Sequence, residues 1–93
     1  MNIALHDHIQ KELLTHHSLA AALWLIDAGR ELEFACDGHT GFISASGSSH
    51  TVSLWQDDVE QAFDSAEALF ADADFAGSSL LALWEYLEII TLF

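Results

Sequence analysis

The middle of the chain alternates between apolar and polar residues, and this alternation constrains the fold more than any other feature. In ELEFAC (residues 31–36), one face of an extended chain carries the apolar side chains Leu32, Phe34 and Cys36. Asp37–Gly38 follows as a turn signal, and the strand-like segments TGFISA (residues 40–45) and HTVSLW (residues 50–55) are separated by another turn, SGSS (residues 46–49). The pattern predicts a three-stranded antiparallel meander, which needs helices packed on one face to be stable.

The residues before this meander have helical periodicity. Apolar side chains recur every four residues near the start of the chain, at Leu5, Ile9 and Leu13. They would share one side of a helix that Asn2 is suited to cap. In HSLAAALWLIDAG (residues 17–29), Ser18 is a suitable N-cap and Gly29 stands where a C′ glycine is expected. A strand over residues 23–27 is the alternative, but the alanines of this segment favour the helix.

A second helical pattern begins at Asp57. Its apolar positions fit the 3.6-residue period, at Val59, Ala62, Phe63, Ala66, Leu69 and Phe70. AGSS interrupts the pattern, and Ser78 or Ser79 is expected to cap the last segment, LLALWEYLEIITLF. Its final residues, EIITLF, are β-branched and aromatic, so an edge strand is the alternative there. We expect a single α+β domain over residues 1–93, with a three-stranded antiparallel meander packed against helices in the order ααβββαα.

The chain is strongly acidic. Fifteen Asp and Glu residues accompany two basic residues, Lys11 and Arg30, which gives a formal net charge of −13 at pH 7. This charge opposes direct binding to nucleic acid or to an anionic membrane, and it favours a basic protein as the partner. An acidic surface that serves solubility, as in halophilic proteins, is the alternative interpretation.

Three further features indicate the compartment. The single cysteine, Cys36, excludes an intrachain disulfide and fits a reducing environment, and its place among apolar residues indicates a buried thiol. The N-terminal residues lack the basic region and apolar core of a signal peptide. The longest apolar run, LAAALWLI, is far shorter than the roughly 20 residues needed to cross a bilayer. We therefore expect a cytoplasmic protein.

The helix predicted from Asp57 supplies the candidate binding site. Its carboxylates are spaced by three, four, three and seven residues, at Asp57, Glu60, Asp64, Glu67 and Asp74. Residues three and four apart are neighbours on a helix surface, so these side chains are expected to form one row. No Lys or Arg follows Arg30 to compensate them. The row is our predicted partner-binding site, with an ordinary solvated face as the alternative. Asp58 is left out because acids in a first helical turn already complement the helix dipole.

The N-terminal histidines offer an alternative metal site. His8, Glu12 and His16 lie at i, i+4 and i+8 on one side of the predicted helix, and both residue types bind metals. Eight residues of helix span about 12 Å, so at most two of the three would share one ion. Cys36 and His39 are half of a zinc site without a second pair, and the serines of SASGSS are not part of a nucleophile elbow. We therefore expect no metal, no cofactor and no catalytic residue.

The C-terminal segment is apolar on both sides of its predicted helix. Such a helix is normally buried on both sides, whereas a chain of this length hides only about two thirds of its unfolded surface. Another chain is therefore expected to cover the second side. The predicted dimer or partner surface consists of Leu81, Trp84, Ile89 and Phe93. A structural module that forms a homodimer through this segment is the alternative function.

In size, acidity and compactness, the chain resembles small acidic inhibitor proteins. This class includes phage proteins that block host defence systems such as CRISPR effectors, known as anti-CRISPR proteins, and immunity proteins that neutralise nuclease toxins. The resemblance carries no residue assignments, because it is one of general character. It implies a non-enzymatic protein that imitates nucleic acid and occupies a basic, nucleic-acid-binding surface of its partner.

Overall fold

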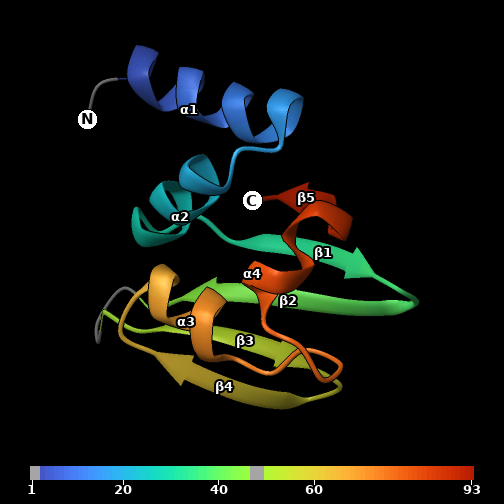
Figure 1. The fold of residues 1–93 in the computed structure, drawn as a ribbon. Helices are drawn as coiled ribbons and strands as arrows, with labels where there is room; N and C mark the ends of the chain where they lie inside the picture. Colours follow the sequence, from blue (N-terminus) through green and yellow to red (C-terminus); the bar gives the residue numbers. More distant parts are fainter. Residues whose placement is uncertain (1–2, 47–49) are drawn as a thin grey trace.

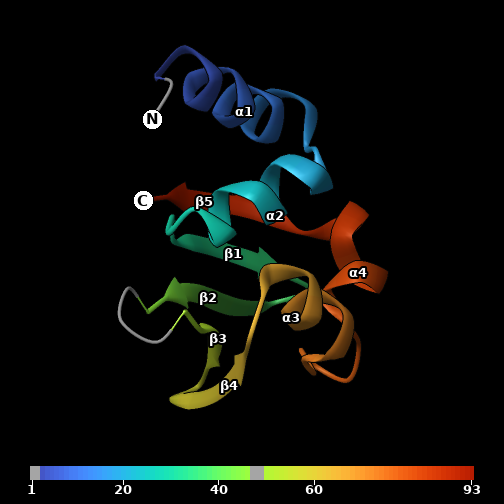
Figure 2. The same cartoon turned by 90° about the vertical axis from the view of Figure 1, so that its left-hand side faces the viewer.

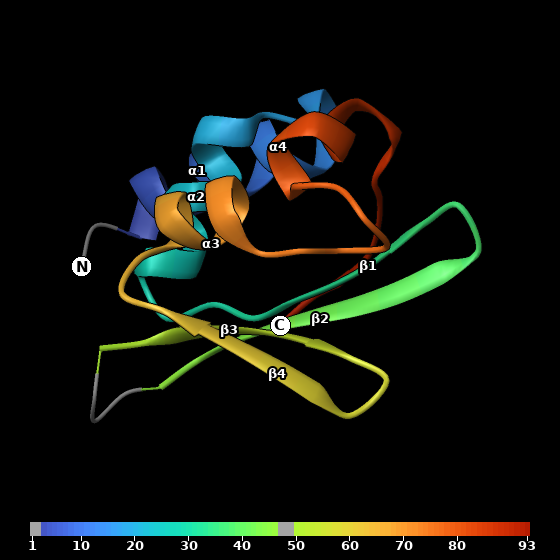
Figure 3. The ribbon, with the colours of Figure 1, turned by 60° about the horizontal axis from the view of Figure 1, so that its bottom comes forward.

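The computed structural model describes residues 3–46 and 50–93, and it has the α+β architecture expected from the sequence (Figure 1). An antiparallel sheet forms one layer, and the helices all lie on one side of it (Figure 3). The elements in chain order are α1 (Ile3–His16), α2 (Leu19–Asp27), β1 (Leu32–Cys36), β2 (His39–Ala45), β3 (Val52–Gln56), β4 (Val59–Phe63), α3 (Ala66–Asp72), α4 (Leu80–Leu83), the 3-10 helix η1 (Trp84–Tyr86) and β5 (Glu88–Leu92).

The five strands have the spatial order β4-β3-β2-β1-β5, and Figure 2 shows them in succession. β1, β2 and β3 are the predicted meander, in which each strand pairs antiparallel with the next. β4 extends the meander by a further hairpin, whereas β5 returns from the far end of the chain to pair with β1. The predicted order ααβββαα is therefore wrong in detail, because it omits β4 and β5.

The β3–β4 hairpin explains why the helix predicted from Asp57 is wrong. Gln56 pairs with Val59 across a two-residue turn. The turn residues, Asp57 and Asp58, both have positive φ, 52° and 66°. Such a turn matches the twist of the strands that it joins, and glycine is its usual signal, as in the correctly predicted β1–β2 turn at Asp37–Gly38. Aspartate also tolerates positive φ, but a turn without glycine is hard to recognise from the sequence.

Replacing Asp58 with glycine is expected to stabilise the protein by roughly 0.5–1 kcal/mol, because glycine adopts positive φ without steric cost. The change also removes a negative charge beside Asp57. Urea denaturation should show a higher midpoint with an unchanged slope. The matched control is Asp58→Ala, which removes the same charge but keeps a Cβ, and its midpoint should lie below that of Asp58→Gly. Equal midpoints for the two variants would contradict the strained turn.

Both N-terminal helices form as predicted. The hydroxyl of Ser18 accepts a hydrogen bond from the backbone N–H of Ala21 (3.2 Å) and caps α2, and Gly29 follows the helix with a φ of 100°. The alternative strand over residues 23–27 is therefore wrong. The proposed cap Asn2 and most of the predicted SGSS turn lie outside the described residues.

The C-terminal part forms short helices and a strand where two long helices were predicted. Ser65 caps α3, and Ser79, one of the two predicted caps, begins α4. α4 is one turn long, and η1 leads from it into β5. The edge-strand alternative for EIITLF is thus right and the helix to Phe93 is wrong. The β-branched residues of this segment favour a strand, and β1 has a free side with which to pair it.

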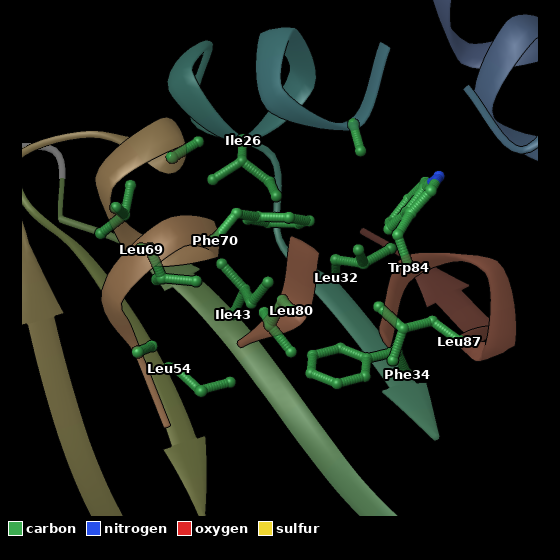
Figure 4. Close-up of a cluster of buried hydrophobic side chains, with 14 of the residues drawn as sticks. Ile26, Leu32, Phe34, Ile43, Leu54, Leu69, Phe70, Leu80, Trp84 and Leu87 are labelled. Atoms are coloured by element: carbon green, nitrogen blue, oxygen red, sulfur yellow. The ribbon is translucent and has the colours of Figure 1, made fainter. Parts of the chain in front are cut away.

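The hydrophobic core lies between the sheet and the helices (Figure 4). β1 points Leu32, Phe34 and Cys36 into it, as the alternation predicted. Phe70 of α3 is fully buried, and its ring centroid lies 5.8 Å from that of Trp84. The core therefore fixes α3 and α4 against the sheet.

One of the two cations, Arg30, connects α1 to the end of β5. Its guanidinium Nη1 donates to His6 Nε2 (2.7 Å) and to Gln10 Oε1 (3.1 Å), both on α1. Its Nε donates to the backbone carbonyl of Phe93. Arg30 is therefore engaged within the protein.

Candidate partner-binding surface

The five predicted carboxylates lie around one edge of the sheet, so the prediction of a straight row on one helix is wrong. Asp57 is in the β3–β4 turn and Glu60 is on β4. Asp64 follows β4, Glu67 is in the first turn of α3, and Asp74 follows α3. All five residues are exposed. Their common neighbour is β4, which is the outermost strand on this side of the sheet.

Two contacts hold the helix-side members of this set near β4. α3 packs against β4, and the side chain of Gln61 on β4 makes two hydrogen bonds to the backbone of Asp74, each 2.8 Å long. Glu60 and Gln61 are adjacent on a strand, so their side chains point to opposite faces of the sheet. The carboxylates thus surround the edge on both faces and at both ends of β4. We call this set the acidic rim: Asp57, Glu60, Asp64, Glu67 and Asp74.

The acidic rim has no cation nearby in the sequence, since no Lys or Arg occurs after Arg30. Arg30 is engaged with α1 and β5, and Lys11 lies exposed on α1. In the described part of the chain, the one close contact between a basic and an acidic side chain joins His8 and Glu12 on α1, with 3.7 Å between Nε2 and Oε1, and it is an ion pair only when His8 is protonated. Uncompensated carboxylates repel one another, and a basic partner would relieve that repulsion.

The outer edge of β4 also presents backbone hydrogen-bonding groups. Gln56 and Val59 flank a two-residue hairpin turn and are therefore a hydrogen-bonded pair. Because bonded positions alternate along an antiparallel strand, the backbone N–H and C=O groups of Glu60 and Ala62 point away from β3. Charged side chains commonly protect such an edge from pairing with other chains. Edge protection is thus an alternative explanation of the acidic rim that requires no partner.

The uncovered face of the sheet carries a row of side chains that the sequence pattern does not predict. Strand pairing places Glu33 of β1 opposite Phe42 of β2, and Phe42 opposite Trp55 of β3. Trp55 in turn lies opposite Glu60 of β4. Two aromatic rings therefore lie between two carboxylates, and we call these four residues the sheet-face row. The register of Trp55 against Glu60 follows from the β3–β4 turn at Asp57 and Asp58, which lacks the glycine that would have revealed it in the sequence.

The four apolar residues predicted as a dimer or partner surface do not form one patch. Trp84 is 8% exposed and belongs to the core, and Ile89 of β5 packs against the core. Leu81 is exposed on α4, in the helical layer. Phe93 is exposed at the end of β5, and its ring meets that of Phe42 edge to face with centroids 5.8 Å apart.

Other polar residues were possible metal ligands or line a hollow beside α3. Among the residues that the structure describes, no three His, Cys, Asp or Glu side chains are grouped to hold a metal ion. A hollow of about 530 Å³ is lined in part by Asp27, His50 and Asp64. Asp27 Oδ1 accepts a hydrogen bond from the backbone N–H of Ala66 (2.9 Å), so this carboxylate helps to cap α3.

A comparison of the chain with protein-family models, curated proteins and solved structures finds no match. Within the described residues, no helix combines the length and the apolar character needed to cross a membrane.

Proposed function

We propose that this protein is a non-enzymatic inhibitor that occupies a basic, nucleic-acid-binding surface of a partner protein. The observation that supports the proposal is the acidic rim, whose five exposed carboxylates surround β4 with no Lys or Arg among residues 31–93. Edge protection accounts for a charge on β4 itself. It does not account for further carboxylates on α3 and in the loop that follows α3.

The extent of the acidic rim suits a groove that binds a nucleic-acid backbone. A strand advances about 3.3 Å per residue, so the carboxylates of Asp57 and Asp64 at the two ends of β4 are separated by roughly 20 Å. Nucleic acid presents negative charge repeatedly over a comparable distance. Lys and Arg side chains that normally contact phosphates would then contact carboxylates. Such charge complementarity mainly accelerates association and favours the right partner.

The proposal is tested by neutralising the acidic rim without changing its shape. The rim variant is Glu60→Gln, Asp64→Asn, Glu67→Gln and Asp74→Asn. Its matched control removes the same number of exposed charges elsewhere, by Asp7→Asn, Asp37→Asn, Glu85→Gln and Glu88→Gln. A pull-down identifies basic proteins that the wild type and the control retain and the rim variant loses. With the purified partner, the rim variant should bind at least about tenfold more weakly, and the wild type should displace bound nucleic acid.

Salt dependence provides a second measurement on the same complex. Because salt screens exposed charges, the association rate of the wild type should fall at least about tenfold between about 50 mM and 500 mM salt. An association rate that does not change with salt, or equal losses in the rim variant and its control, would contradict the proposal. Sedimentation at several concentrations tests the homodimer alternative, which predicts a tight dimer that the rim variant retains.

A further inference from the structure

The proposed function leaves open how the partner is recognised, and the sheet-face row addresses this question. We infer, on the basis of that function, that this row binds arginine side chains of the basic partner. Trp55 is the ring on which a guanidinium stacks, and Glu60 is the carboxylate with which the guanidinium pairs. Glu33 supplies a second carboxylate at the other end of the row. No described helix covers this face of the sheet (Figure 3).

Trp55 presents an indole ring that is partly exposed and hydrogen-bonded at its edge. It is 38% exposed, and its Nε1 donates a hydrogen bond to Ser44 Oγ (3.1 Å) on the neighbouring strand β2. The ring of its cross-strand neighbour Phe42 is in turn contacted by Phe93. An aromatic ring that is held at its edge and partly open to solvent is a suitable surface for a planar cation.

Glu60 is held beside this ring. Trp55 and Glu60 follow the hydrogen-bonded pair next to the turn, so they form a non-hydrogen-bonded pair, in which side chains lie closest, with Cβ atoms about 4.5–5.5 Å apart. Ser53, which is 6% exposed, donates its hydroxyl to Glu60 Oε2 at 2.6 Å. This bond restrains the carboxylate, and Oε1 makes no hydrogen bond with a described residue.

This combination favours arginine over lysine. A guanidinium is planar and weakly hydrated, so it stacks on aromatic rings and donates two parallel hydrogen bonds to a carboxylate, whereas an ammonium acts as a point charge. The chain's own arginine, Arg30, is engaged elsewhere. A second copy of the chain is a poor occupant, because it also carries a net charge of −13. A purely apolar segment would leave both carboxylates of the row without a counter-ion.

The test compares two labelled peptides of equal length and charge, nona-arginine and nona-lysine. We expect the wild type to bind nona-arginine about tenfold more tightly, because only arginine gains from both stacking and bidentate pairing. Trp55→Leu removes the stacking surface but keeps Glu60, so it should reduce the preference for nona-arginine at least about threefold. The matched control is Trp24→Leu, which removes a similarly exposed tryptophan from α2 and should keep the preference.

The outcomes separate this inference from the proposed function. Equal, salt-sensitive binding of both peptides would overturn the inference and leave the proposed function standing. An arginine preference that Trp55→Leu does not reduce would also overturn it, since the preference would then not depend on the proposed ring. If neither peptide binds, both proposals fail.

A measurement on the unmodified protein keeps the inference testable even if Trp55→Leu does not fold. The three tryptophans give three indole N–H signals in a ¹H–¹⁵N NMR spectrum. Titration with nona-arginine should shift the signal of Trp55, whereas those of Trp24 and Trp84 stay in place. Saturation with the peptide while the Trp55 signal remains stationary would refute the assigned site.

Discussion

Replacing Phe70 with alanine is expected to lower the free energy of unfolding by about 3–5 kcal/mol, the range observed when a buried aromatic ring is removed. Phe70 has no solvent exposure, and it packs with Trp84 at the centre of the core. The cavity would open where α3, α4 and the sheet meet, among side chains that are fixed by several elements and have little freedom to collapse. A domain of 93 residues has a total stability of roughly 5–14 kcal/mol, so this variant would lose a large part of it.

Urea denaturation measures this loss as a fall in the transition midpoint. The control is Glu67→Ala on the same helix, which removes an exposed side chain and should change the stability by less than about 1 kcal/mol. A loss below about 1.5 kcal/mol for Phe70→Ala would mean that the ring is not packed as described.

The same variant bears on function, because Phe70 holds α3 on the sheet and α3 places Glu67 in the acidic rim. We expect it to weaken partner binding even under conditions where most molecules remain folded.

The elements that the sequence predicted correctly are those with local signals. The β1–β2 hairpin can be predicted from the alternation in residues 31–36 and from the Asp37–Gly38 turn. Both signals depend only on residues that are close together in the sequence. α2 has a serine cap at one end and a glycine at the other. These features act over a few residues, so they can be recognised without knowledge of the rest of the fold.

β4 and β5 were harder to predict for two different physical reasons. The segment Val59–Phe63 satisfies a helical period as well as a strand, and the turn before it consists of Asp57 and Asp58 without the usual glycine. β5 depends on a contact between distant parts of the chain, since Phe34 of β1 pairs with Ile89. The β-branched and aromatic residues of this segment indicate a possible strand. Whether the strand forms depends on the unpaired edge of β1, which the sequence alone does not reveal.

The candidate site likewise has features that the sequence alone predicts and features that depend on the fold. The acidic composition and the lack of cations after Arg30 are properties of the sequence, and they do not depend on the fold. The spatial arrangement was predicted from the wrong period, and the structure replaces a helical row with a rim around β4. The pairing of Trp55 with Glu60 depends on the hairpin register, which a helical interpretation of the same residues cannot give.

Replacing Gly41 with alanine is expected to destabilise the protein by about 2–3 kcal/mol through overpacking. A Cβ at this position would lie 2.4 Å from Phe34 Cζ and 2.9 Å from Phe75 Cε1. Both rings are almost completely buried, and their centroids are 5.1 Å apart, so neither can move away freely. The glycine is required for space here, because its φ is not among the positive values.

A double-mutant cycle isolates the collision from any general effect of the substitution. Phe34→Leu removes the ring atom that lies nearest to the added Cβ, so Gly41→Ala should cost at least about 1 kcal/mol less in that background than in the wild type. An equal cost in both backgrounds would contradict the steric explanation. The position also matters for the acidic rim, because Phe75 occupies the space above Gly41 and directly follows Asp74. Because Gly41 has no side chain, the loop after α3 can pack against β2 and place Asp74 in the acidic rim. Gly41→Ala should therefore weaken partner binding as well as lower the stability of the fold.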